Sequence, residues 1–208
     1  MAILPLGTTN VLAKELKIPE DVNRAVARII NGRARRLYVG NLTFPYGDSK
    51  KFFLMAGVGF DAEAVYNVNR KLKSMGGKAG YLAGGLRVLL DWAPGPKRAL
   101  IDRRPFEFSS LIVCKGARYG GYPKAAPDAS LENPGLYAVV MRGGKRRDVL
   151  RYTFGILTGR HTAFSDVAYL KCGRVEVLDA AHIQADGDYI GKTPVAIETA
   201  RETLLFVY

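Results

Sequence analysis

The sequence is poor in the residues that build disulfide frameworks and zinc sites. Among its 208 residues are two cysteines, Cys114 and Cys172, and two isolated histidines, His161 and His182. Two cysteines do not make a disulfide framework, and no Cys/His cluster has the spacing of zinc ligands. We therefore expect both thiols to be reduced and buried, and we assign no metal-ligating residue.

Longer sequence signatures are absent as well. No apolar run reaches the ~18 residues of a membrane-spanning helix, and no charged segment precedes an apolar one as in a secretory signal. The Gly-rich Lys-Ser/Thr phosphate loop and the G-x-G-x-x-G dinucleotide fingerprint are also missing. These absences favour a cytoplasmic globular protein and exclude two widespread signatures of nucleotide binding.

What the sequence has in excess is positive charge. Lys and Arg number 31 against 19 Asp and Glu, for a net charge of +12, and 48% hydrophobic residues are ample for a core. The charge suggests an anionic partner, either an anionic membrane surface or nucleic acid. No recognised nucleic-acid motif accompanies the charge, so a basic nucleic-acid-binding module is the weaker hypothesis.

The chain is organised around its first segment, residues 2–10 (AILPLGTTN), which runs into residues 11–16. An apolar run, a Pro/Gly break and a Thr-Thr-Asn cluster predict a strand, a turn and a capped helix. A turn of this kind directs unpaired backbone N–H groups at one point, and anions bind at such points. An ordinary capped helix start is the alternative.

The rest of the chain predicts a few helices among many strands. A short helix is expected after Asp21, and a β region begins near Arg35, so we place a domain boundary between residues 1–32 and 33–208. Further helices are expected over residues 62–74, 77–92 and 148–157. Strands are expected over residues 35–42, from residue 52, and over 97–102, 106–115, 167–170, 174–177 and 183–185.

Several glycine-rich segments stand out as candidate binding regions. Gly57 and Gly59 precede Asp61, which indicates a backbone that something approaches closely, although Asp61 could instead cap the next helix. Residues 119–121 (YGG) predict a constrained loop, with an edge-strand bulge as the alternative. The apolar, Gly-rich 77–92 helix is either a core helix or a wall of an acyl-chain cavity.

Two carboxylates, Asp186 and Asp188, flank Gly187 at the end of an expected strand. Asp-Gly is the ordinary signal of a hairpin turn, which is one interpretation. The other is chemical, because phosphoryl transfer to an alcohol needs a carboxylate within hydrogen-bond reach of the hydroxyl proton. We keep both acids as candidates for that base.

Segments in the same order along the chain resemble the diacylglycerol kinase catalytic-domain family, the bacterial lipid kinases related to sphingosine kinases. The matching segments are G-T-x-N at 7–10, G-x-G-F-D-A at 57–62, Y-G-G at 119–121, A-P-x-A at 126–129 and Asp-Gly-acid at 186–188. The resemblance implies an α+β, mainly β fold: an antiparallel β-sandwich with a few helices, preceded in residues 1–32 by a remnant of a Rossmann-like nucleotide-binding domain.

The resemblance also implies site roles. Gly7, Thr8 and Asn10 would line the nucleotide cleft, and Asp61 would lie beside the lipid headgroup pocket. Asp186 or Asp188, the latter in place of the family's Glu, would be the general base. The implied reaction is phosphorylation of a lipid hydroxyl, such as that of diacylglycerol or a sphingoid base, with ATP and Mg²⁺ as cofactors.

The sequence departs from the family pattern at Pro134, where the family has the Asp of an Asp-Gly-Leu segment that helps hold a structural magnesium ion. Proline has no ligand oxygen on its side chain, so Glu132, Asp128 or main-chain carbonyls would have to substitute. The family's upstream half, with its Gly-Gly-Asp-Gly-Thr nucleotide loop, would lie before Met1. We therefore expect this chain alone to be inactive as a kinase.

Partners follow from these expectations. We predict a lipid substrate and an anionic membrane surface, which would make the protein cytoplasmic and peripheral at the membrane. A homodimer is left open. A non-catalytic lipid-binding protein on the same fold is the alternative function, and it predicts lipid retention without turnover.

Overall fold

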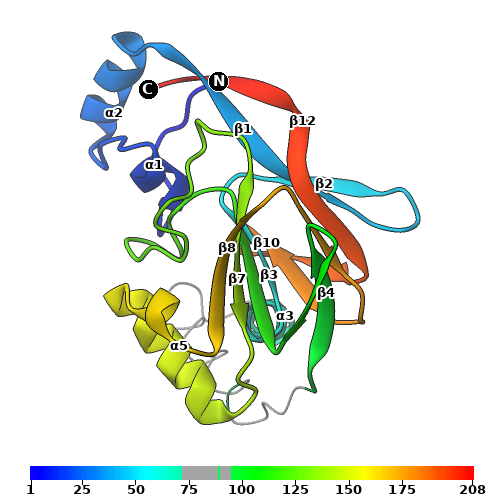
Figure 1. Cartoon of the computed structure of the whole chain (residues 1–208). Coiled ribbons are helices and arrows are strands. Elements are labelled where there is room, and N and C mark those ends of the chain that lie inside the picture. The colour runs from blue at the N-terminus through cyan, green and yellow to red at the C-terminus, as the bar shows by residue number, and fades with distance from the viewer. Residues whose placement is uncertain (72–88, 90–94) are drawn as a thin grey trace.

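The computed structural model describes residues 1–71, 89 and 95–208, and for residues 68–71 it describes the backbone alone. Two antiparallel sheets make up most of this part of the chain, with helices at their margins (Figure 1). The expected 77–92 helix lies outside the described residues, apart from Leu89, so its suggested part in an acyl-chain cavity stays a prediction.

Most of the described elements are strands, as the sequence predicts. The structure also has strands over residues 49–52, 136–141, 188–192 and 195–207 that sequence analysis did not predict, and the expected 106–115 strand is interrupted at Ser109. The described helices are α1 (Val11–Glu15), α2 (Val22–Ile30), α3 (Phe60–Lys71), α5 (Arg146–Thr158) and the 3-10 helix η1 (His161–Ala163). The strands are β1 (Ala34–Thr43), β2 (Ser49–Phe52), β3 (Met55–Val58), β4 (Lys97–Ile101), β5 (Arg104–Phe108), β6 (Ser110–Cys114), β7 (Leu136–Met141), β8 (Val167–Cys172), β9 (Arg174–Val177), β10 (His182–Ala185), β11 (Asp188–Lys192) and β12 (Val195–Val207).

The strands form two six-stranded sheets. The first has the order β2-β1-β12-β9-β4-β5 and the second the order β11-β10-β3-β6-β7-β8. Neighbouring strands pair antiparallel throughout, for example β1 with β12 from Ala34↔Val207 to Thr43↔Ala196. The expected α+β, mainly β sandwich is therefore confirmed.

The main core lies between the sheets, and the alternation of strand side chains builds it. On β6, Leu111 and Val113 face the core between the sheets, while Ile112 and Cys114 face a second cluster on the outer side of their sheet. Tyr152 of α5 belongs to that second cluster. Because both faces are covered, every residue of β6 is buried, which explains its uninterrupted apolar sequence.

Both cysteines are buried and unpaired, as expected. Burial raises the pKa of Cys172 to about 12 and raises the pKa of Cys114 further. Thiols with such pKa values stay protonated at neutral pH and react slowly. Cys114 and Cys172 therefore serve as small apolar core residues.

The first ten residues differ from expectation, because no strand forms over residues 2–6. Met1 pairs with the end of β12, where its ammonium donates to Leu205 O at 2.7 Å and its carbonyl accepts from Val207 N at 2.8 Å. A tight turn then follows, in which Leu6 N donates to Leu4 O at 2.9 Å across Pro5. Pro5 itself has no N–H to donate to a strand ladder.

Helix α2 begins where the sequence predicts. Asp21 is its N-cap, and its side chain accepts a hydrogen bond from Arg24 N at 2.9 Å. Helices α1 and α2 pack through Leu16 and Ala25 onto Leu37 and Phe206, which lie on β1 and β12. None of the helices in the described part of the chain has the length and apolar character that a bilayer crossing requires.

Candidate functional site

The Asp186-Gly187 dipeptide forms the turn between β10 and β11, in which Ala185 pairs with Asp188. Asp186 has φ 50° and Gly187 has φ 95°, so both central residues are left-handed. Two central residues with positive φ are what a type I′ hairpin needs, and Asp-Gly is a favoured sequence for it. The hairpin interpretation is therefore confirmed, and it leaves the chemical role of the two acids open.

The Asp186 carboxylate is held by the main chain between β2 and β3. Oδ2 accepts from Phe53 N at 2.6 Å, and Oδ1 accepts from Leu54 N at 2.8 Å and Met55 N at 3.0 Å. The residue as a whole is exposed, but burial of its carboxylate raises the pKa of Asp186. The three backbone N–H groups lower this pKa, and the charge of Asp188 raises it. A general base at neutral pH works best with a pKa of about 7, and a raised pKa brings a carboxylate closer to this value.

Asp188 is the first residue of β11 and is exposed. Its carboxylate makes no hydrogen bond or ion pair with any residue that the structure describes. The two acids thus differ in surroundings: the main chain binds Asp186, whereas Asp188 keeps free oxygens for a proton or a ligand.

Asp61 lies in the first turn of α3 and is half-buried. Its Oδ1 accepts a hydrogen bond from the Tyr119 hydroxyl at 2.6 Å, and its Oδ2 accepts one from Gln184 Nε2. Burial raises the pKa of Asp61, and the two hydrogen bonds offset part of the rise. The carboxylate is therefore bound by side chains from other elements, and the alternative interpretation, that Asp61 caps its own helix, is wrong.

Gln184 connects Asp61 to the carboxylate turn. This β10 residue is 1% exposed, and its Oε1 accepts a hydrogen bond from Gly187 N at 2.8 Å. Its amide therefore contacts Asp61 with one end and the Asp186-Gly187 turn with the other. A buried amide with both ends bonded fixes the relative positions of its partners.

At each of the two glycines before Asp61, a larger side chain would clash with a different neighbour. A Cβ on Gly57 would lie 2.2 Å from Asp61 Oδ2 and 2.7 Å from Gln184 Nε2. Gly59 has φ +98°, and a Cβ there would lie 2.5 Å from Ser109 O. Gly57 thus leaves the space in which the Asp61–Gln184 hydrogen bond forms.

The 117–129 loop links this region to α1. Tyr119, which binds Asp61, is held in the loop by a hydrogen bond from its N to Pro123 O at 2.9 Å. The Glu15 carboxylate of α1 accepts from Ala117 N at 2.9 Å and from Arg118 N at 3.1 Å. Burial and the Asp61 charge raise the pKa of Tyr119, which keeps its hydroxyl a hydrogen-bond donor.

Gly7, Thr8 and Asn10 lie together on the loop before α1. Asn10 is the N-cap residue with φ 46°, but its side chain makes no cap bond. Instead, its Oδ1 accepts from Gly7 N at 2.7 Å and its Nδ2 donates to Pro5 O at 2.9 Å. The expected side-chain capping is therefore wrong, because the Asn10 amide binds the preceding loop. No hydrogen bond joins this loop directly to Asp61, Asp186 or Asp188 among the described residues.

The structure therefore links Asp61 to the turn that bears Asp186 and Asp188, through one residue that sequence analysis missed, Gln184. Its place on a strand just before Asp-Gly was the available signal, because a polar residue buried inside a strand must find bonding partners. Glu15 was missed as well, since a Glu in a short helix is ordinarily a surface residue.

The loop at residues 130–134 holds a buried lysine where the family resemblance implies a metal ion. Lys115 Nζ donates to Ser130 O at 2.6 Å and Asn133 O at 2.7 Å, and burial lowers the pKa of Lys115 to about 8. Glu132 pairs instead with Arg35 at 3.1 Å. No group of three or more His, Cys, Asp or Glu that could hold a metal is present among the described residues. This loop does not fit a structural metal site.

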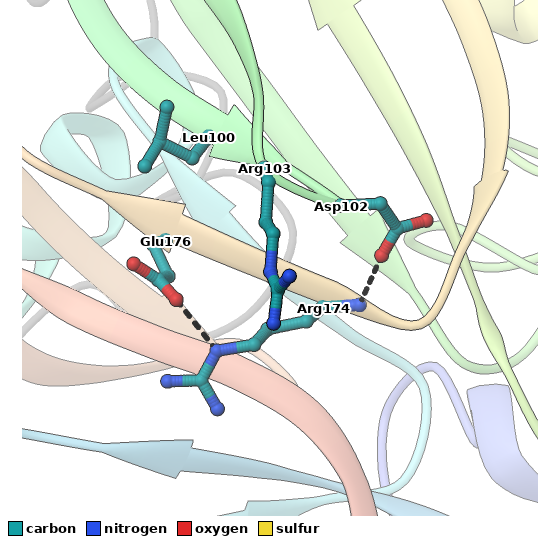
Figure 2. Close-up of a pocket in the computed structure, with 5 residues that line it drawn as sticks. All are labelled: Leu100, Asp102, Arg103, Arg174 and Glu176. Atoms are coloured by element: carbon teal, nitrogen blue, oxygen red, sulfur yellow. Dashed lines mark hydrogen bonds and ion pairs between the residues drawn. The ribbon is translucent and has the colours of Figure 1, made fainter.

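A surface hollow of different chemistry lies elsewhere. It measures about 520 Å³ and lies beside the β4–β5 turn of the first sheet, as Figure 2 shows. Several of its polar groups are bonded within the protein: Asp102 accepts from Arg174 N at 2.9 Å, and the Arg174 guanidinium binds Glu176 and Glu198. None of the predicted site residues lines it.

Comparisons with known proteins agree with this architecture. Residues 55–207 match the family model described as "YegS C-terminal NAD kinase beta sandwich-like domain", and residues 1–42 match "Diacylglycerol kinase catalytic domain". The diacylglycerol kinase of Bacillus subtilis is 31% identical over 199 residues, which cover 93% of this chain and 64% of that protein. The diacylglycerol kinase of Staphylococcus saprophyticus is 26% identical over 93% of this chain and 63% of its own length.

A solved structure has the same fold. The crystal structure of a diacylglycerol kinase from Bacillus anthracis superimposes with a TM-score of 0.70 at 22% identity, over all of this chain and 68% of the other. The chain thus spans just under two thirds of the length of the two curated relatives. Because one family model covers most of the chain and the other its N-terminal segment, the chain belongs to the bacterial diacylglycerol kinase family.

Proposed function

We propose that the chain supplies the lipid-binding and proton-accepting part of an ATP-dependent lipid kinase. The observation that carries the proposal is the hydrogen-bonded connection from Asp61 through Gln184 to the turn that bears Asp186 and Asp188. It brings a half-buried acid and two further carboxylates into one polar region beside the second sheet. Family membership gives the reaction class, and this region gives the residues.

The reaction needs a group that takes the proton from the lipid hydroxyl as it attacks the γ-phosphate. In the proposal the Asp186 and Asp188 pair supplies that group. Asp186 has the raised pKa and a fixed position, and Asp188 has the free oxygens. Separate variants of the two residues assign the base.

Asp61 is proposed to act on the lipid side. Its carboxylate is oriented by Tyr119 and Gln184, so it can accept a hydrogen bond from a headgroup hydroxyl in a fixed direction. Diacylglycerol and sphingoid bases both present such a hydroxyl, and either could be the substrate class.

The nucleotide side of the proposal rests on the family and on residues 7–10. ATP with Mg²⁺ supplies the phosphoryl group in kinase reactions. Gly7, Thr8 and Asn10 are the residues of this chain proposed to face it. Because the Asn10 amide binds Pro5 and Gly7, we propose that Asn10 shapes this loop for the nucleotide.

The test measures transfer of labelled phosphate from ATP to diacylglycerol and to sphingosine in mixed micelles. The chain is assayed alone and joined to the upstream half of the Bacillus subtilis relative. We expect turnover in the joined form only, because the chain alone lacks the family's nucleotide loop. Asp186→Asn and Asp188→Asn are compared in that form, and loss of about 10²-fold or more in kcat identifies the base.

A stability measurement keeps the two variants interpretable. Asp186→Asn places an amide where three backbone N–H groups point, so it should also cost about 1–3 kcal/mol of unfolding free energy. Asp188→Asn should leave stability unchanged. If the joined form has no activity with either lipid, yet the chain still retains lipid during purification, the kinase proposal fails and the lipid-binding alternative replaces it.

A further inference from the structure

Helix α5 has one face buried and the other open to solvent. Its residues Val149, Tyr152, Gly155 and Ile156 are buried and cover the outer side of the second sheet. Figure 1 shows this helix at the edge of the molecule, at the end away from both termini. The opposite face of α5 has no covering element among the described residues.

That open face carries an apolar stripe. Leu150, Phe154 and Leu157 are 57%, 64% and 62% exposed. At 3.6 residues per turn, positions i, i+4 and i+7 lie within one narrow sector of the helix surface. Scattered exposed apolar residues need no explanation, but an aligned set on one helix marks an interaction surface.

Basic residues stand at the N-terminal end of the stripe. Arg142, Lys145, Arg146 and Arg147 are all exposed. Lys145 and Arg146 form no ion pair with any described residue, and Arg147 reaches Asp148 at 4.0 Å only. Cations near the start of a helix oppose its dipole, so intrahelical electrostatics do not account for them. An external anionic partner does.

The buried face of α5 packs near the candidate lipid site. Val149, next to Leu150 in sequence but on the buried face, packs against Phe60 and Leu89. Phe60 immediately precedes Asp61, the acid proposed to bind the lipid headgroup. Helix α5 thus contacts the residue next to that acid with one face and carries the stripe on the other.

We propose that α5 docks the protein on an anionic membrane surface, with Leu150, Phe154 and Leu157 inserted among the lipids and Lys145, Arg146 and Arg147 bound to phosphate headgroups. An apolar helix face with flanking Lys and Arg is the arrangement by which helices lie in a bilayer interface. The biological role of this docking rests on the proposed function, because docking would bring Asp61 to the membrane that holds a lipid substrate. The physical basis of the docking is the helix surface alone.

The test is flotation of the chain with vesicles of phosphatidylcholine alone and of equimolar phosphatidylcholine and phosphatidylglycerol. The wild type should bind the anionic vesicles more than about tenfold better. The triple variant Leu150→Ser, Phe154→Ser, Leu157→Ser should lose about 10- to 100-fold in partitioning to the anionic vesicles. Arg146→Glu with Arg147→Glu should remove the preference for anionic vesicles.

The matched controls lie on β12, which belongs to the first sheet, whereas α5 covers the second sheet. Leu205 is 63% exposed, so Leu205→Ser removes a similar exposed side chain, and Arg201→Glu reverses an exposed charge. Both should bind vesicles as the wild type does. Thermal unfolding of every variant shows whether the fold is kept, which is expected because the substituted side chains are solvent-exposed.

Two outcomes overturn the proposal. One is unchanged vesicle binding by the folded triple variant. The other is the same unchanged binding together with the loss of a concentration-dependent dimer in sedimentation velocity. That result would make the stripe a self-association surface. Vesicle binding needs neither ATP nor turnover, so an inactive kinase assay leaves this test untouched, and failure here leaves the carboxylate assignments to their own assay.

Discussion

Gln184 donates a hydrogen bond to Asp61 from 123 positions away in the sequence. The same buried amide accepts from Gly187 N at 2.8 Å, so α3 and the β10–β11 turn are fixed to each other through one side chain. Asp61 and the turn that bears Asp186 and Asp188 are therefore connected through one side chain. Four substitutions test this connection and the two loops beside it.

Gln184→Met keeps the volume of the side chain and removes both hydrogen bonds. Asp61 Oδ2 and Gly187 N then lose their partner in a buried setting, so unfolding free energy should fall by about 2–4 kcal/mol. Urea denaturation measures the change. Asn31→Met is the matched control, because it removes a solvent-exposed amide bond to Ala27 O and should cost under about 1 kcal/mol. Equal losses in the two variants would contradict a special role for Gln184.

Gly57→Ala adds a single methyl group between Asp61 and Gln184. The methyl would lie 2.2 Å from Asp61 Oδ2, so the two side chains must separate, at a cost of about 1–3 kcal/mol in unfolding free energy. Gly173→Ala is the control, since its nearest neighbour, Asp102 Oδ1, would lie at an ordinary 3.6 Å. Thermal unfolding compares the two, and a stable Gly57→Ala protein would show that the packing there is loose.

Lys115→Met tests the ammonium that binds the 130–134 loop. The pKa of Lys115 is lowered by burial from 10.5 to about 8. Between these values the unfolded chain binds more protons than the folded one, so wild-type stability gains from rising pH, by about 3 kcal/mol at most. Below about pH 8 both states are protonated and the contribution is constant.

The methionine variant lacks this titration and leaves Ser130 O and Asn133 O without their donor. We expect it to be about 1–3 kcal/mol less stable than the wild type near pH 7. The difference between the two proteins should then widen as pH rises from about 8 towards 10. Urea denaturation across that range measures it, and a constant difference would place the pKa of Lys115 near its ordinary value.

Asn10→Ala tests whether the 5–10 loop depends on one amide. Alanine loses the bonds to Gly7 N and Pro5 O and disfavours φ 46°, so the loop should open, at a cost of about 1–2 kcal/mol. Asn10→Gly keeps the φ and loses the bonds alone, which separates the two causes. Amide exchange at Gly7 reports loop opening, and unchanged exchange in both variants would show that Asn10 does not hold the loop.

Several of the strands and helices were predictable from the sequence, because strand alternation, apolar runs and Asp-Gly or Pro-Gly turns are local signals. The sandwich class followed from the family resemblance. The start of a helix after Asp21 was predicted in this way and was found, and so was the hairpin interpretation of residues 186–187. Prediction from local signals failed where a residue found a hydrogen-bond partner other than the one that the local pattern suggests. The segment before Pro5 formed no strand, and the Asn10 side chain bound its own loop instead of the helix.

Tertiary structure alone decided which side chains meet. Asp61, Tyr119 and Gln184 come from three separate elements, and only the pairing of β10 with β3 brings them together. Likewise, nothing in the sequence shows that Lys115 is buried against the carbonyls of Ser130 and Asn133. Periodicity specifies which face of a strand or helix is apolar, but the contact between two faces depends on the register and packing of the whole sandwich.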